Sequence, residues 1–233
     1  TAPTASISQI SEWMAKEDRL ATGYEIHVRR YRELDEASGL FLGLTSERPI
    51  ADFDMPALRS QLRQLRVRTE VYLVETKSGL KVLPYDVGEG IAQVLPVVVA
   101  VLAPGPSVVA IEQPELHVHP RIQVEIGQLL VHWKYLWHEM FSQVTNRKLT
   151  NSLLIETHSE HILLRLLKRI KESSRRADTG IATELRSSEI SVLYVVPGEE
   201  GAQVAELRVD ARGEFIDQWP EGFFEERGEE LFG

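Results

Sequence analysis

An apolar segment that ends in carboxylates is the part of the sequence best suited to chemistry. Residues 108–111 read Val-Val-Ala-Ile, and Glu112, Gln113 and Glu115 follow. Ligands bind at the carboxyl ends of strands in open α/β sheets. A carboxylate fixed there can hold Mg²⁺, because hard cations prefer oxygen ligands and a nucleotide supplies the remaining ones. Glu112 is the candidate for this role, whereas Glu115 can either contact the cation or favour the start of the helix that follows.

A second short apolar segment ends in a similar way. Residues 153–155 are followed by Glu156, Thr157 and His158, and Ser159 is a suitable N-cap for a helix. An imidazole at such a strand-to-helix junction can donate a hydrogen bond to a phosphate oxygen. His158 is therefore a second candidate, although a single histidine is more often structural.

A third segment, residues 86–96, contains Gly88, Glu89 and Gly90 just before a predicted helix. Glycines allow backbone N–H groups to approach a phosphate closely, and the helix dipole favours an anion at that end. By itself this pattern is weak, since glycines before a helix usually form an ordinary turn.

The elements that must position these residues indicate an α/β fold. Hydrophobic periodicity predicts helices over 7–20, 56–65, 91–102 and 120–146 and from Ser159 onward, and strands over 24–28, 67–75, 80–83, 108–111, 153–155, 191–196 and 203–209. The continuous apolar character of 108–111 and 153–155 predicts strands buried on both faces of a parallel sheet. We therefore expect three parts: a helix with antiparallel strands over 1–85, an α/β core over 86–196, and a β-hairpin with an acidic aromatic tail over 197–233.

Composition restricts the class of protein further. The chain has 233 residues, of which 43% are hydrophobic and 26% charged, and it contains no cysteine. No apolar run reaches the roughly 20 residues that span a bilayer, so we expect no membrane insertion and a cytoplasmic location. The net charge is −9, but residues 161–186 hold 7 bases and 3 acids. This basic segment can be a solvated helix face or a contact for DNA.

The order of these three motifs resembles the C-terminal half of ABC-type ATPases, including the SMC-like and OLD-like predicted ATPases of bacteria. The resemblance covers roughly residues 70–195. A closer similarity is to a predicted-ATPase family with a C-terminal domain of unknown function, which extends the resemblance to the tail segment 215–224. It implies a P-loop NTPase-like fold, ATP and Mg²⁺ as ligands, and a head-to-tail homodimer that sandwiches the nucleotide.

The resemblance also implies roles for particular residues. Gly88, Glu89 and Gly90 match the signature loop that touches the nucleotide of the partner subunit, Glu112 matches the Walker B carboxylate for Mg²⁺, and His158 matches the switch histidine. His119 falls in the D-loop region. Gln113 stands where most ABC ATPases have the glutamate that polarises water, and a glutamine can orient water but cannot accept its proton. Turnover is then slow, or Glu115 substitutes, or the nucleotide acts as a clamp.

One expected motif is absent. No G-x-x-x-x-G-K-[ST] sequence occurs in the chain, and in an ATPase of this type it would precede Thr1. We therefore expect this chain alone to bind ATP poorly and not to hydrolyse it.

Two alternatives stay open at this point. The first is a non-catalytic module that binds DNA or an effector protein, for example in phage defence. The second is a metal-dependent hydrolase whose ligands are His117, His119, His158, His161, Glu112 and Glu115.

Overall fold

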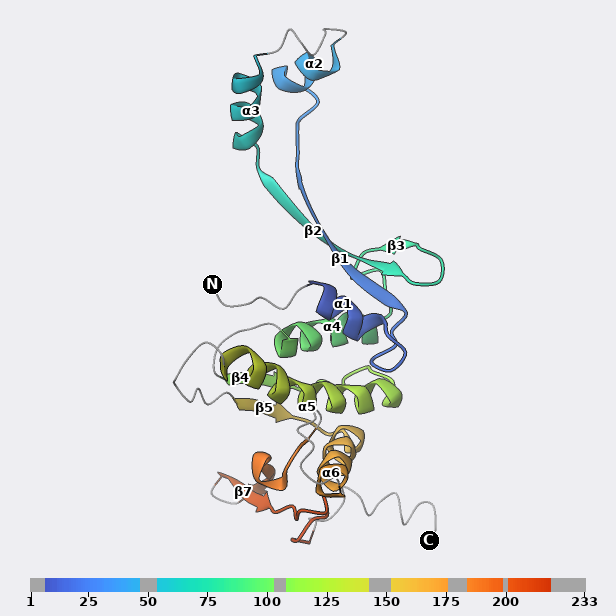
Figure 1. The fold of residues 1–233 in the computed structure, drawn as a ribbon, viewed down its shortest axis with the longest axis vertical. Helices are drawn as coiled ribbons and strands as arrows, with labels where there is room; N and C mark the ends of the chain where they lie inside the picture. The colour runs from blue at the N-terminus through green and yellow to red at the C-terminus, as the bar shows by residue number, and fades with distance from the viewer. Residues whose placement is uncertain are drawn as a thin grey trace.

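A computed structural model describes residues 7–46, 54–102, 108–142, 152–175, 184–198 and 201–218. The described part is mixed α/β, with α-helices around three small sheets. Figure 1 shows a body of packed helices from which a long arm projects at one end and a hairpin at the other. No helix in these ranges is long and apolar enough to cross a membrane.

The first helix is shorter than predicted. Helix α1 (Ile7–Ala15) ends before the turn that contains Leu20, where the N–H of Thr22 donates to the carbonyl oxygen of Met14 at 2.9 Å. Leu20 is nevertheless buried, because the turn folds back onto the helix. The hydrophobic periodicity of the sequence extends to Leu20 because this residue packs in the same core as α1.

The arm is an antiparallel ribbon with two helices at its far end (Figure 1). Strand β1 (Tyr24–Arg32) pairs along its whole length with β2 (Val67–Glu75), and β3 (Lys81–Val82) adds a short third strand. Between β1 and β2 lie α2 (Gly39–Thr45) and α3 (Met55–Gln64), neither of which has a buried residue. The predicted antiparallel pairing is confirmed; β1 is four residues longer than predicted, β2 has the predicted bounds and β3 is shorter.

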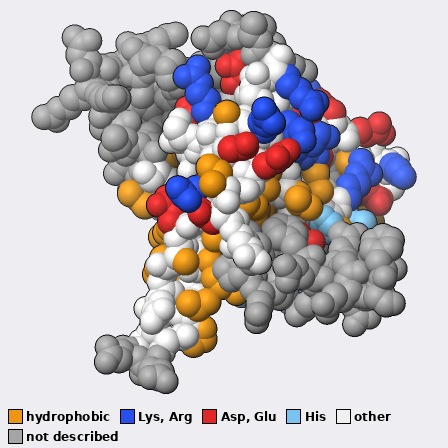
Figure 2. Space-filling model, turned by 90° about the horizontal axis from the view of Figure 1, so that it is seen from below, with side chains coloured by type: hydrophobic (Ala, Val, Ile, Leu, Met, Phe, Trp, Pro, Cys, Tyr) orange, Lys and Arg blue, Asp and Glu red, His pale blue; other side chains and the backbone are white. Residues whose placement is uncertain are grey.

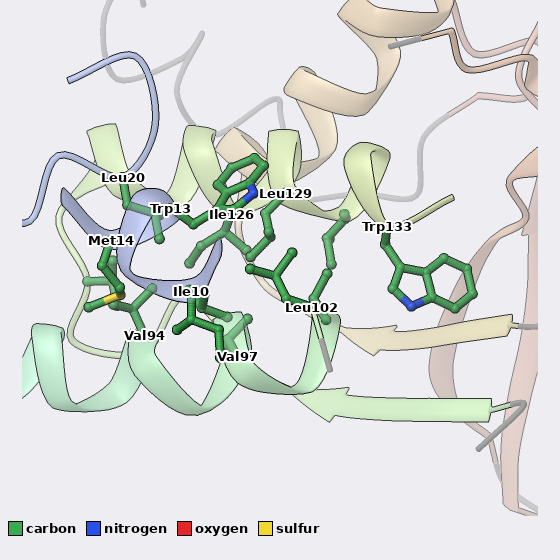
Figure 3. Packing of buried hydrophobic residues seen from close by; sticks show 14 of the residues in the cluster. Ile10, Trp13, Met14, Leu20, Val94, Val97, Leu102, Ile126, Leu129 and Trp133 are labelled. Carbon is green, nitrogen blue, oxygen red and sulfur yellow. The ribbon is translucent and has the colours of Figure 1, made fainter. Parts of the chain in front are cut away.

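The body is formed by helices α4 (Glu89–Leu102), α5 (Pro120–Ser142) and α6 (Glu160–Arg175) beside strands β4 (Val108–Glu112) and β5 (Ser152–Glu156). One hydrophobic cluster joins α1 and the base of the arm to α4, α5 and α6 (Figure 3). Its most deeply buried members include Met14, Leu73, Val94, Ile126 and Ile162. The core therefore draws on both sides of residue 85, and the boundary expected there stays a prediction.

Strands β4 and β5 are parallel, as predicted, but they are not buried on both faces. Ile111 and Ile155 pack against the hydrophobic cluster, whereas Val108 is 55% exposed and Leu154 is 62% exposed. The physical reason is that no described element covers the second face of this two-stranded sheet. The expectation of a doubly buried sheet is therefore wrong for the described residues.

The late strand pair is also shifted. Strand β6 (Val192–Gly198) pairs with β7 (Gly201–Leu207), so that Gly198 and Gly201 belong to the ladder, not to the predicted loop. A Cβ on Gly198 would lie 2.7 Å from the carbonyl oxygen of Gly201, which requires glycine at this close approach. Most of the predicted acidic aromatic tail lies outside the described residues.

Candidate functional site

The carboxyl ends of β4 and β5 lie side by side and carry the central candidate. Glu112 and Glu156 are partners in the parallel register, and the N–H of Gln113 donates to the carbonyl oxygen of Glu156 at 2.8 Å. Both glutamates are exposed. A carboxylate that was buried together with the strand before it would need a cationic partner, but the exposed carboxylate of Glu112 does not. Glu156 was not among the candidate ligands predicted from the sequence, although its apolar strand also ends in a carboxylate.

A cleft of about 320 Å³ opens beside Glu112. It lies between α4, which contributes Gln93, Pro96, Val97 and Ala100, and the end of β4, which contributes residues 110–114. Gln113 lines the same cleft and has a φ of 44°, a conformation that non-glycine residues adopt rarely. Such conformations cluster at functional sites, which makes the turn at Gln113 a feature of the site.

Glu115 connects the loop after β4 to the residues that follow β5. One carboxylate oxygen accepts the hydroxyl of Thr157 at 2.7 Å, and the other accepts the backbone N–H of His158 at 2.6 Å. These bonds tie the loop after β4 to the residues that follow β5. The sequence did not predict this contact, and the two roles that it left open for Glu115 stay predictions.

His158 stands at the junction between β5 and α6, as predicted. Its N–H is fixed by Glu115, while the residue as a whole is exposed. Ser159 caps α6, because its Oγ accepts the N–H of Ile162 at 3.2 Å, and it also donates to Gln123 at 2.6 Å. The backbone around His158 is therefore held by α5 and α6 and by the loop after β4, and the exposed residue follows the carboxyl end of β5, the strand that pairs with β4.

His119 is the N-cap of α5. Its Nδ1 accepts the N–H of Arg121 at 3.2 Å, and its carbonyl oxygen accepts the N–H of Ile122 at 2.8 Å. This places the hydrogen of a neutral imidazole on Nε2. His119 thus has a structural role, and the ligand contact expected for it stays a prediction.

The loop with Gly88, Glu89 and Gly90 starts α4, two residues earlier than predicted. A Cβ on Gly90 would lie 2.6 Å from the carbonyl oxygen of His117, so this glycine is required by the packing of the loop after β4. A Cβ on Gly88 would meet open space. Glu89 lies 3.5 Å from His117 Nε2, which joins the two loops a second time.

The metal-dependent hydrolase is not supported. Among the described residues, no group of three or more His, Asp or Glu side chains could hold a metal ion. The physical reason is that the candidates are used separately: His117 faces Glu89, His119 caps α5, and Glu115 binds the start of α6.

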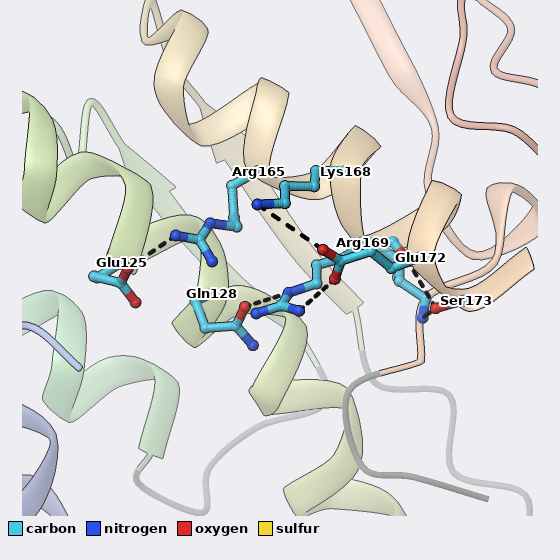
Figure 4. Close-up of polar contacts among 8 residues, drawn as sticks. Glu125, Gln128, Arg165, Lys168, Arg169, Glu172 and Ser173 are labelled. Atoms are coloured by element: carbon cyan, nitrogen blue, oxygen red, sulfur yellow. Dashed lines mark hydrogen bonds and ion pairs between the residues drawn. The ribbon is translucent and has the colours of Figure 1, made fainter. Parts of the chain in front are cut away.

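The basic segment 161–186 is largely neutralised on the described part of α6. Arg165 donates to Glu125 at 2.9 Å, and Arg169 contacts both Gln128 and Glu172 (Figure 4). These side chains of Arg165 and Arg169 are only 16% and 22% exposed. Figure 2 shows cationic and anionic side chains intermixed on one face of the molecule. Arg165 and Arg169 therefore pair with acids of α5 and α6, and the DNA contact expected for the basic segment stays a prediction.

Comparison with known protein families gives one result. The family model described as "AAA domain, putative AbiEii toxin, Type IV TA system" matches residues 7–164. No curated protein and no solved structure matches the chain. The matched range includes the arm, the loop before α4, both strand ends and the beginning of α6.

Proposed function

The chain belongs to this AAA family of P-loop ATPases, and on that premise we propose that it supplies the magnesium-binding and switch side of an ATP site in an ABC-type ATPase. Family membership indicates an ATP-binding module. The assignment to the ABC type, with Mg²⁺ and a nucleotide-sandwich homodimer, is our proposal.

The observation that carries this proposal is the shared sheet edge of Glu112 and His158. Glu112 ends β4, His158 follows β5 directly, and the two strands are hydrogen-bonded neighbours. Oxygen donors from Glu112, with Glu156 beside it in register, suit Mg²⁺ better than a softer metal. When bound, Mg²⁺ neutralises charge on the phosphates, and His158 can donate a hydrogen bond to a phosphate oxygen.

Gly88, Glu89 and Gly90 are proposed as the loop that faces the nucleotide of a second subunit. A Cβ on Gly88 would meet open space, which leaves room for a phosphate. The corresponding space at Gly90 is occupied by the carbonyl oxygen of His117. The N-terminus of α4 then favours negative charge at this loop. The contribution of Gly90 is to the placement of the loop.

Gln113 is proposed to orient water or to hold the nucleotide without rapid turnover. Each oxygen of Glu115 accepts one hydrogen bond, from Thr157 or from the N–H of His158. Of the three explanations that the sequence left open, slow turnover and a clamp rely on a glutamine that cannot take a proton, and the third assigns the water to Glu115. Glu156 is the remaining carboxylate in register at this edge.

A separate polypeptide segment is proposed to supply the phosphate-binding loop. The motif is absent from the sequence, and in the part of the chain that the structure describes, the face of β4 and β5 that carries Val108 and Leu154 is exposed. Parallel sheets are generally covered on both faces, so this face is suited to pack against further elements. DNA or an effector protein stays a predicted partner of the assembled ATPase, and a cytoplasmic location stays a prediction.

The test is reconstitution of the site. We would measure Mg-ATP binding and hydrolysis for this chain mixed with the segment of the full-length protein that carries the phosphate-binding loop. Glu112→Gln and His158→Ala are compared with two matched controls, Glu17→Gln at an exposed carboxylate outside the cleft and His161→Ala on α6. We expect turnover only in the mixture, loss in the first two variants, and retention in both controls. Absence of nucleotide binding in every combination contradicts the proposal.

A further inference from the structure

The far end of the arm consists of two short helices in which no residue is buried. Helix α2 has 7 residues and α3 has 10. Figure 1 shows both helices at the end of the ribbon, away from the packed body. Isolated helices shorter than about 12–15 residues are marginal in water, and most helical stability in proteins comes from the packing of an apolar face. The helices at this tip therefore lack the contact that usually stabilises helices of their length.

Large apolar side chains stay exposed on these two helices. Leu42 of α2 is 60% exposed, Leu44 is 41% exposed, and Met55 of α3 is 39% exposed. The helices do not pack closely on one another, so they do not bury these groups between them. Apolar side chains that gather on one part of a surface mark a contact with another molecule more often than single ones do. The tip is therefore suited to bind a partner through apolar contacts.

Helix α3 carries its apolar and its cationic side chains on adjacent faces. Successive residues of an α-helix are about 100° apart, so Met55, Leu58 and Leu62 fall within roughly 60° of its circumference. By the same spacing, Arg59 and Arg63 fall within the next roughly 80°, on one side of the apolar stripe. These five residues are named the tip face below. A partner must offer apolar groups and, beside them, negative charge.

The tip itself holds negative charge on its other part. Residues 33–46 contain three acids and no Lys or Arg, and residues 55–66 contain three arginines and no Asp or Glu. Asp54, just before the second range, caps α3 by accepting the N–H of Ala57 at 3.2 Å. The described arm, residues 24–46 and 54–75, holds seven arginines and seven acids, so the two signs are separated at the tip without net charge. The three acids are Glu33, Asp35 and Glu36.

Most of these charges do not meet within one copy of the chain. Arg59, Arg63 and Glu36 are exposed, and their side chains make no ion pair with any residue that the structure describes. Asp35 accepts the N–H of Ala37 at 2.8 Å, beside the start of α2. Glu33 differs, because Arg68 Nε lies 2.8 Å from its carboxylate. The cations of the tip face and the acids before α2 are therefore free to pair with another molecule.

A second copy of this chain has the required chemistry. In a two-fold dimer, residue i of one copy contacts residue j of the other, and j contacts i. The arginines of each tip face then meet the acids before α2 of the other copy, so each charge contact occurs twice. A polyanion or an anionic membrane would instead meet these acids with repulsion. We propose that the arm tip is an interface between two copies of this chain, in which the tip face of each packs on α2 of the other and Arg59 and Arg63 lie against Asp35 and Glu36.

This contact is separate from the proposed nucleotide sandwich. The sandwich joins the loop before α4 to the end of β4, and both belong to the body, whereas the tip lies at the far end of the arm (Figure 1). The tip interface needs neither nucleotide nor Mg²⁺. A standard interface uses about 20–30 residues on each side, and the helices of 7 and 10 residues supply fewer. We therefore expect a weak dimer.

Sedimentation equilibrium of this chain, without nucleotide or Mg²⁺, measures the association. The average mass should rise toward twice that of one chain, with a Kd of about 1–100 µM. Leu42→Ser combined with Leu44→Ser should raise the Kd at least about tenfold, because less apolar area is buried. Leu80→Ser combined with Leu193→Ser is the matched control, since these leucines are 60% and 55% exposed outside the tip, and the Kd should not change. Circular dichroism establishes that both variants are folded.

Charge reversal locates the contact. One variant combines Arg59→Glu with Arg63→Glu, and the other combines Asp35→Lys with Glu36→Lys. Each variant alone should dimerise at least about tenfold more weakly, because like charges then oppose one another across the interface. An equimolar mixture of the two should recover the affinity of the unchanged chain, since every charge contact in the mixed pair again joins opposite signs.

A control reverses two cations outside the tip. Lys77→Glu combined with Arg212→Glu changes the net charge by the same amount as the first variant and should leave the Kd unchanged. Equal weakening in this control, or no recovery in the mixture, overturns the assignment to the tip. A chain that stays monomeric at every concentration overturns the interface, and a monomer that binds anionic lipid vesicles through the tip overturns the choice of partner. Because no sample contains nucleotide, the result is independent of the proposed ATP site.

Discussion

The carboxylate of Glu115 accepts the backbone N–H of His158 at 2.6 Å, and this bond joins the loop after β4 to the start of α6. The two residues are 43 positions apart, so the contact depends on the parallel pairing of β4 with β5. It fixes the backbone of the proposed switch histidine relative to Glu112. The placement of His158 is therefore coupled to the strand that carries the proposed cation ligand.

Changing Glu115 to Leu, which has no acceptor atom, should release the N–H of His158. A hydrogen bond to a charged group contributes about 1.5–3 kcal/mol, so hydrogen exchange at the His158 amide should rise by roughly 10- to 100-fold, provided that local opening limits exchange. Amide exchange measured by NMR gives this rate directly. Thr157→Val is the control: it removes the other bond to Glu115 and the bond that Thr157 Oγ1 accepts from the Ser159 N–H, and it leaves the bond from the His158 N–H to Glu115 in place. Unchanged protection of His158 in Glu115→Leu contradicts the proposed coupling.

Gly90→Ala should destabilise the fold, because the new Cβ would lie 2.6 Å from the carbonyl oxygen of His117. Overpacking of this kind typically costs about 1–3 kcal/mol of the free energy of unfolding. Gly88→Ala is the control, since its Cβ would meet open space and the expected change is within about 0.5 kcal/mol. Urea denaturation of both variants measures the difference, and equal stability would show that the two loops are not packed as described.

Gln113→Glu should increase ATP turnover in the reconstituted site. A positioned general base typically contributes about 10²–10⁴-fold, and glutamate can accept the proton that glutamine cannot. Steady-state hydrolysis at saturating Mg-ATP is the measurement, with Glu17→Gln as a charge-altered control outside the cleft. If ATP binds and Gln113→Glu leaves turnover unchanged, the glutamine is not the residue that limits the chemical step.

The ion pair between Arg208, which follows β7 directly, and Asp217 should make the stability of this part of the chain depend on pH. Hydrogen bonds from Arg208 lower the pKa of the Asp217 carboxyl to about 2. A lowered pKa means that the stabilisation is present above the ordinary aspartate pKa and is lost as the pH falls through about 2. A carboxyl ¹³C NMR titration should show this midpoint, and Arg208→Gln should raise it toward the ordinary value. An identical midpoint in the two proteins contradicts the pairing in solution.

The sequence predicted local structure well where the signal was local. The apolar runs located β4 and β5 to within one residue at each end, and Ser159 was identified as the cap of α6. Both depend on residues near one another in the chain, through hydrogen bonding and burial of neighbouring side chains. Buried Leu20 made the pattern of α1 appear longer than the helix, because periodicity reports burial and not backbone conformation.

The sequence by itself determined that carboxylates and a histidine follow two short apolar strands. Only the tertiary structure decided which of these groups meet. Parallel pairing placed Glu112 beside Glu156, the loop after β4 turned Glu115 toward His158, and the packing of α5 with α6 brought Arg165 to Glu125. Distances between residues far apart in the chain are set by strand register and helix packing, and these depend on the complete core and not on any local pattern.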